Sequence, residues 1–283
     1  MKEKFFKILT WLAIMAVLTL LALGIWMIVW GDQSTASLKW LQFLQMIGTF
    51  LFPPFICAWL WSSDRQPLRW LHLNRGAHWS LFALAVGIMI CAIPGINLLA
   101  DLNSRISLPE SLASLEQFLK QQEETAAALT ERFLKADNIG TLLINIGLMA
   151  LLPALAEELS FRGTLQQTLG NKHLAIWLTA IVFSAIHMQF YGFIPRMLLG
   201  AMFGYIFLWT GSLWVPILMH FTNNGLAVLA YYLTSNSDSD PTSNVPQNIA
   251  DTIGAGDTWW LGLISILITC LGLLIFYRRT HKR

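Results

Sequence analysis

Charged residues are scarce in this 283-residue chain, where they make up 12% of the sequence, against about 25% in a typical soluble domain. Hydrophobic residues make up 55%, and the mean hydropathy is +0.57. A chain so poor in charge would not stay dispersed in water, so a soluble globular domain is excluded and a lipid solvent is predicted. No phosphate-binding loop or nucleic-acid motif is present, and no nucleic-acid partner is expected.

Cysteine is equally scarce. The three cysteines, Cys57, Cys91 and Cys270, all lie in apolar runs, where a thiol behaves as a small hydrophobe. The absence of a CxxC pair or a Cys/His cluster argues against both a disulfide framework and a cysteine zinc site. The first apolar run lacks a small-residue cleavage site, so it is predicted to be a retained span and not a signal peptide.

Long apolar runs, by contrast, recur along the whole chain. A helix needs about 20 apolar residues to cross a bilayer. Five runs reach that length, and the apolar stretch 173–235 divides at two breaks into three shorter spans. The predicted fold class is all-α: a polytopic integral membrane helical bundle with about eight transmembrane helices, at 8–30, 39–61, 78–100, 139–160, 173–190, 194–210, 213–234 and 257–277.

The positions of Lys and Arg predict the orientation of these spans. Basic residues precede the first span, lie between the second and third, and close the chain, whereas 236–256 has none. With an even number of spans, both termini are predicted to be cytoplasmic, in the plasma membrane. Four parts are expected: three N-terminal helices in 1–100, a helical loop in 101–138, a core in 139–235, and a polar loop, last helix and basic tail in 236–283.

The loop 101–138 has leucines at helical spacing, as at Leu112, Leu115 and Leu119. Two structures fit this pattern. One is an amphipathic helix lying on the membrane surface, and the other is a soluble helical hairpin that caps the bundle.

Two adjacent carboxylates mark the fourth span. Of the 16 Asp and Glu residues, only Glu157 and Glu158 fall in the interior of a predicted span, since Asp257 is the first residue of the last one. An ionisable group at the centre of a membrane helix costs at least ~2.5–3.5 kcal/mol on insertion scales, so such groups are usually functional or paired. Arg162 follows Glu158 by four residues, on the same helical face, and is predicted to pair with it. Glu157 points about 100° away from Glu158 around the helix axis, so it is not part of this pair and is available for another interaction.

Two of the six histidines, His187 and His220, lie well inside apolar runs. His187 follows Phe183 by four residues and is placed inside the fifth span. His220 precedes Asn224 by four residues, which puts an imidazole and an amide on one helical face. Any one of these polar groups would more often be a structural contact, but five or six on consecutive helices favour a functional polar cavity.

Two prolines precede these groups. Pro153 lies four residues before Glu157, and Pro216 lies four residues before His220. A proline inside a helix removes a backbone hydrogen bond and kinks the helix. Both prolines are therefore expected to open space beside the polar side chains and to admit water.

The three motifs together resemble a known family. Glu157-Glu158-x-x-x-Arg162, Phe183-x-x-x-His187 and His220-x-x-x-Asn224 are similar to the motifs of the CPBP family, the CAAX prenyl endopeptidases and bacteriocin-processing or immunity proteins, also called Abi. The resemblance covers roughly 139–235. It implies an intramembrane endopeptidase that hydrolyses a peptide bond in a membrane-associated protein or a lipidated, CAAX-like peptide.

The resemblance and the residue chemistry imply the same roles. Glu157 would be the general base, His187 would hold the water, and His220 and Asn224 would bind the oxyanion. Glu158 and Arg162 would support them.

Two questions stay open at this point. The reaction could be glutamate-dependent and metal-free, or it could use a zinc ion bound by Glu157, His187 and His220. The same polar groups also fit a proton-coupled transporter, and the same fold fits a non-catalytic immunity or adaptor protein.

Overall fold

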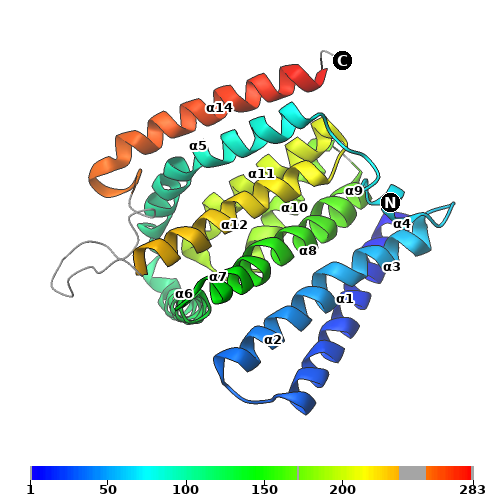
Figure 1. Cartoon of the computed structure of the whole chain (residues 1–283), viewed down its shortest axis with the longest axis horizontal. Helices are drawn as coiled ribbons and strands as arrows, with labels where there is room; N and C mark the ends of the chain where they lie inside the picture. Colours follow the sequence, from blue (N-terminus) through cyan, green and yellow to red (C-terminus); the bar gives the residue numbers. More distant parts are fainter. Residues whose placement is uncertain (1, 171, 236–252, 282–283) are drawn as a thin grey trace.

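The computed structural model describes residues 2–170, 172–235 and 253–281, and these residues form helices and no β-strand (Figure 1). The predicted all-α membrane bundle is therefore confirmed. The helices are α1 (Lys2–Val29), α2 (Thr35–Gln45), α3 (Phe52–Trp61), α4 (Pro67–Trp70), α5 (Trp79–Ser104), α6 (Ala113–Leu134), α7 (Ile139–Asn145), α8 (Leu152–Ser160), α9 (Gln167–Leu169), α10 (Lys172–Ala185), α11 (Phe193–Thr210), α12 (Trp214–Ser235) and α14 (Trp259–His281).

Several of these segments join end to end into longer continuous helices. A π-helical turn at Met46–Leu51 connects α2 to α3, and two more, at Ile146–Leu151 and Phe161–Gln166, connect α7 to α8 and α8 to α9. Three short 3₁₀ turns, at Glu110–Leu112, Phe190–Gly192 and Gly256–Thr258, precede α6, α11 and α14.

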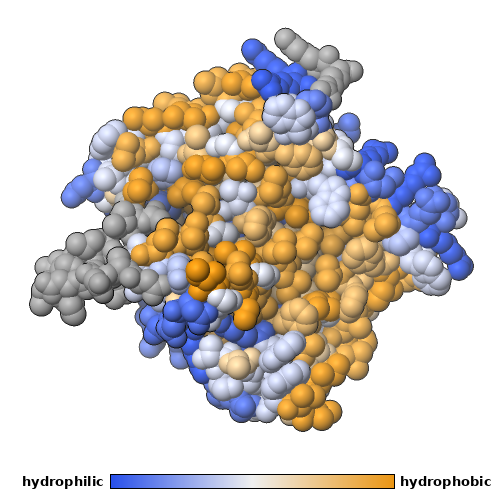
Figure 2. All heavy atoms as spheres, in the orientation of Figure 1, coloured by the Kyte–Doolittle hydropathy of each residue, from blue (hydrophilic) through white to orange (hydrophobic). Residues whose placement is uncertain are grey.

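Six helical stretches of the described residues, counted across the π-helical and 3₁₀ turns that join their segments, are long and apolar enough to cross a membrane. They correspond to the predicted first, second, third, fourth, sixth and last spans. The predicted fifth span is the 14-residue helix α10, and the predicted seventh is the 22-residue helix α12. An apolar surface covers much of the molecule between hydrophilic ends (Figure 2), as expected of an integral membrane protein.

Segments that are far apart in sequence meet at one end of the bundle. Lys4 Nζ donates to the carbonyl of Leu169 at 3.0 Å, which brings the start of α1 to the end of α9. The rings of Trp209 and Tyr277 lie 5.3 Å apart, which brings the end of α14 to the end of α11. The start of α1 and the end of α14 therefore lie at the same end of the bundle, as an even number of crossings requires.

The opposite end is covered by α6, a single helix and not a hairpin. Arg132 on α6 donates to the carbonyl of Gln33 at 2.6 Å and to Thr35 Oγ1 at 2.8 Å. Leu112, Leu115 and Phe118 are exposed, whereas Phe133 packs into the bundle. α6 therefore links the α1–α2 connection to the core and keeps apolar side chains on its outer surface.

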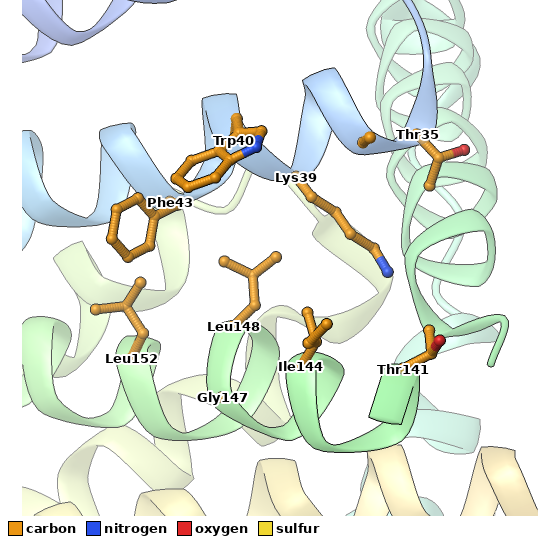
Figure 3. Close-up of a pocket in the computed structure, with 10 residues that line it drawn as sticks. Thr35, Lys39, Trp40, Phe43, Thr141, Ile144, Gly147, Leu148 and Leu152 are labelled. Atoms are coloured by element: carbon orange, nitrogen blue, oxygen red, sulfur yellow. The ribbon is translucent and has the colours of Figure 1, made fainter. Parts of the chain in front are cut away.

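A groove of about 680 Å³ separates α2 from α7 and α8 (Figure 3). Apolar side chains such as Trp40 and Leu152 line it, and Lys39 reaches across it to donate to Asn145 Oδ1 at 2.6 Å. Leu152 and Glu157 point about 140° apart around α8, because successive helical residues are rotated by 100°. The groove and the acidic residues therefore lie on different faces of α8.

Candidate active site

The two adjacent glutamates lie on α8, a short α-helical segment between two π-helical turns. Pro153 is at the start of this segment, directly after the wide turn Ile146–Leu151. A proline lacks an N–H and its ring crowds the carbonyl four residues earlier, and a wider turn accommodates both effects. A π-helical turn thus precedes the carboxylates, and the expected opening of space beside Glu157 at Pro153 stays a prediction.

The expected kink at Pro216 is absent, and that prediction was wrong. α12 begins at Trp214, so Pro216 lies in its first turn. The first backbone N–H groups of a helix have no intrahelical partner, so a proline there breaks no hydrogen bond. Pro216 therefore helps to start α12 and leaves the segment at His220 regular.

Glu158 joins two helices through one carboxylate oxygen. Arg162 Nη1 donates to Glu158 Oε1 at 2.6 Å, the pairing that the four-residue spacing predicts. His220 Nδ1, from α12, donates to the same oxygen at 2.9 Å. Arg162 Nη2 also donates to the carbonyl of Gly200 on α11 at 2.9 Å. Since Glu158 and Arg162 are 0% exposed, this network fixes α8, α11 and α12 to one another through charge-assisted hydrogen bonds.

Aromatic rings enclose the network. Phe203 stacks on the His220 ring with centroids 5.4 Å apart, and Phe183 meets the same ring edge-on at 6.1 Å. The Arg162 guanidinium lies 4.9 Å from the centre of the Phe183 ring. Cation–π contact and the exclusion of water both strengthen the ion pair, because the local dielectric is low.

Glu157 faces away from this network and into a cavity of about 250 Å³. His220 Nε2 lies 3.9 Å from Glu157 Oε2, too far for a hydrogen bond but short enough for one water to bridge the two atoms. His187 and Asn224 line the same cavity, so the structure brings together all four residues predicted to be catalytic. Glu157 and His220 are 6% and 5% exposed, so water reaches them only through this cavity.

His187 does not lie inside a helix, which corrects the predicted extent of the fifth span. α10 ends at Ala185, and His187 is in the turn that leads to α11. Its Nδ1 donates to the carbonyl of Phe183 at 2.8 Å, so the side chain satisfies an open carbonyl at the helix end. The sequence stays largely apolar through this turn, so hydropathy alone does not reveal it.

This turn is held by side chains from two neighbouring helices. Asn103, on α5 and 2% exposed, donates through Nδ2 to the carbonyl of Phe190 at 3.0 Å and accepts at Oδ1 from the N–H of Ile194 at 2.9 Å. Glu123 on α6 accepts from the N–H of Tyr191 at 3.3 Å. Irregular backbone within a membrane protein is tolerated where the protein itself satisfies it, and these residues do so here.

We therefore expect Asn103→Ala to destabilise the turn that carries His187. The substitution leaves the N–H of Ile194 without its partner, at a cost of about 1–3 kcal/mol, and removes one of the two donors to the carbonyl of Phe190, which keeps the N–H of Phe193. The melting temperature of the detergent-solubilised protein should fall further than that of Asn97→Ala, the matched control, which removes an exposed hydrogen bond made by the same helix. An unchanged melting temperature for Asn103→Ala would show that the turn is held by other contacts.

Two polar residues that line the cavity were missed by the sequence analysis. Asn223 lines the cavity beside Asn224 and donates through Nδ2 to Asn224 Oδ1 at 3.1 Å, so it orients the predicted amide. Arg196, in the first turn of α11, also lines the cavity. A signal for Arg196 was present in the sequence, because it is the one Asp, Glu, Lys or Arg between Lys172 and Asp238.

The three predicted zinc ligands do not form a metal site in this arrangement. Among residues 2–170, 172–235 and 253–281, no three His, Cys, Asp or Glu side chains are grouped closely enough to hold an ion. Both imidazoles direct Nδ1 to protein acceptors and keep Nε2 free, as zinc-binding histidines do, but the three side chains are not grouped closely enough to share one ion. The spacing of these side chains therefore does not fit a bound zinc ion.

Comparison with known proteins agrees with this geometry. The family model described as type II CAAX prenyl endopeptidase Rce1-like matches residues 139–226, the segment from the start of α7 to the middle of α12. Residues 139–226 are similar to this family. The resemblance that the three motifs carry is thereby confirmed for this segment, which contains all six predicted site residues.

A relative with a curated description is the uncharacterized protein YpbD of Bacillus subtilis (strain 168), which is 35% identical over 77 residues. The match covers 26% of this chain and 38% of the relative, so the chain spans well under half of that protein. No solved structure matches the chain.

Proposed function

We propose that this protein is an intramembrane endopeptidase that hydrolyses a peptide bond with water activated by Glu157. The observation that carries the proposal is the shared cavity, where the Glu157 carboxylate lies 3.9 Å from His220 Nε2 and His187 and Asn224 complete the lining. An amide bond needs a nucleophile, a base and a group to hold the oxyanion, and these side chains can supply each of them.

In the proposed reaction, a water between Glu157 and His187 loses a proton to Glu157 as its oxygen bonds to the scissile carbonyl carbon. The carbonyl oxygen becomes the oxyanion. Glu157 then passes the proton to the departing amine nitrogen, and the carbon–nitrogen bond breaks. The immediate products are a carboxylic acid and an amine; the proton of the acid then moves to the amine, which leaves a carboxylate and an ammonium group, and Glu157 returns to its starting form. General acid–base catalysis of this kind contributes about 10²–10⁴-fold to a rate.

His220 and Asn224 would bind the oxyanion. Glu158 accepts a hydrogen bond from His220 Nδ1 at 2.9 Å and so orients the ring with Nε2 beside Glu157, from where Nε2 would donate to the oxyanion when it carries a proton. The amide of Asn224 supplies a second donor, and its oxygen accepts from Asn223 at 3.1 Å. The Glu158–Arg162 pair would act by holding His220 in position, without touching the substrate.

The proposed substrate is a membrane-associated protein or a lipidated peptide of the CAAX type, which reaches the cavity from the bilayer. We further propose that the protein lies in the plasma membrane with both termini cytoplasmic. The basic residues at the start of α1, between α3 and α5, and at the end of α14 support this orientation.

The proposal is tested by comparing membrane peptides from cells that express the wild-type protein or Glu157→Ala. We expect peptides with new termini in the wild-type sample alone. Identical peptides in both samples would contradict the proposal and would favour a transporter or a non-catalytic immunity protein with this fold.

A metal-free reaction carries its own expected result. Wild-type protein purified in detergent should hold far less than one zinc ion per chain and should keep its activity after dialysis against a chelator. Elemental analysis of the same active sample decides the question. Stoichiometric zinc, lost together with activity and restored with it, would contradict a metal-free reaction.

A further inference from the structure

Arg196 is a cation in the cavity that the proposed hydrolysis does not use. It lies in the first turn of α11 and lines the same cavity as Glu157 and His187. No other Asp, Glu, Lys or Arg occurs between Lys172 and Asp238. Because an ionisable residue within a membrane segment is costly, one in this position calls for a partner or a function.

The Arg196 guanidinium is only partly satisfied by the protein. Nη2 donates to Gln189 Oε1 at 2.6 Å, whereas Nη1 is buried and has no hydrogen-bond partner. Among the described residues, no carboxylate lies within ion-pair distance of Arg196. A buried guanidinium nitrogen that lacks an acceptor is normally costly, so it fits a site where a ligand supplies the acceptor.

The surroundings hold the guanidinium in place and favour an anion. Gly192 packs against it, and a Cβ at position 192 would lie 2.9 Å from Arg196 Nη2. Gly192 and Pro195 also line the cavity, so the first turn of α11 borders it. The N-terminus of a helix carries a partial positive charge, which adds to that of the arginine.

We propose that Arg196 binds the free C-terminal carboxylate of the substrate. A guanidinium matches a carboxylate through two parallel hydrogen bonds, and one unpartnered nitrogen is already present to make the first. The cavity of about 250 Å³ also holds Glu157, so the bound carboxylate lies only a few residues beyond the scissile bond. This inference rests on the proposed hydrolysis.

The test compares peptides that differ in one group at the C-terminus. Short N-palmitoylated peptides with randomised C-terminal residues are made as free acids and as amides, and each set is incubated with the wild-type protein in liposomes. We expect the acids to be cleaved about 10–100-fold faster, the range expected for a charge-assisted hydrogen bond. Arg196→Gln should cleave both sets at the slower rate, whereas a merely structural role would slow both sets equally.

Two further variants sharpen the comparison. Gly192→Ala displaces the guanidinium without removing its charge, so it should reduce the preference for acids. Arg105→Gln, at an exposed arginine on the loop after α5, should keep the full preference. Equal cleavage of acids and amides by the wild-type protein would overturn the inference.

Binding to Glu157→Gln separates this inference from the hydrolysis itself. In this variant the acids should bind more tightly than the amides by the same factor, and the added substitution Arg196→Gln should abolish the difference. Cleavage that needs Glu157 but ignores the terminal group would leave the proposed hydrolysis standing and overturn the role of Arg196. Selective binding of the acids, with no cleavage by the wild-type protein, would overturn the proposed hydrolysis and leave the role of Arg196 standing.

Discussion

Glu157→Gln is expected to slow peptide hydrolysis by about 10²–10⁴-fold while leaving the fold intact. The amide keeps the size of the carboxylate but cannot accept the proton of the attacking water. Because Glu157 makes no hydrogen bond with its neighbours in the described chain and borders the cavity, removal of its charge should disturb few contacts. The turnover number should therefore fall, and the melting temperature should stay close to that of the wild type.

The measurement is the initial rate of peptide cleavage in liposomes, together with thermal unfolding of the same preparations. Glu131→Gln is the matched control, because Glu131 is an exposed residue on α6 and pairs only loosely with Lys135 at 3.6 Å. A Glu157→Gln protein that is folded and cleaves as fast as the control would exclude Glu157 as the base.

The second large effect concerns stability. Arg162→Leu is expected to destabilise the protein by about 3–5 kcal/mol, because it leaves the buried Glu158 carboxylate without its cationic partner and with the hydrogen bond from His220 alone. Glu158 and Arg162 are both 0% exposed, and the carbonyl of Gly200 would lose its donor as well. The yield of folded protein and its melting temperature in detergent should both fall sharply.

The double variant Glu158→Met/Arg162→Leu separates the two roles of the pair. Replacing both charges by apolar groups of similar size is often nearly neutral for stability, so much of the loss should be recovered. Hydrolysis should nevertheless stay slow, since His220 Nδ1 has then lost its acceptor. A double variant that is stable and fully active would show that Glu158 does not position His220.

The spans were predictable because the hydropathy of a membrane helix is a local property of its sequence. The same reasoning failed at α10, where apolar residues continue through the turn that carries His187. That turn is stabilised by Asn103 and Glu123, which are 87 and 68 residues distant from their partners. No local pattern reveals contacts over such separations.

The candidate site was predictable where it depends on a single helix. The four-residue spacing of Glu158 and Arg162 predicts their ion pair. The same spacing between His220 and Asn224 places these two side chains on one face of their helix. The hydrogen bond from His220 to Glu158 depends on how α12 packs against α8, which spacing does not reveal. Arg196 could have been predicted from the sequence, because it is the one Asp, Glu, Lys or Arg in a long apolar stretch, but the sequence analysis did not predict it.

The central claim is that side chains from separate segments act as one unit on one water, and kinetic non-additivity tests it most directly. Cleavage rates are measured for Glu157→Gln, for His187→Asn and for the double variant. Residues that act as a unit give effects that do not add, so the double variant should be about as slow as the slower single variant. If the two losses multiply in full, Glu157 and His187 act independently and the account is contradicted.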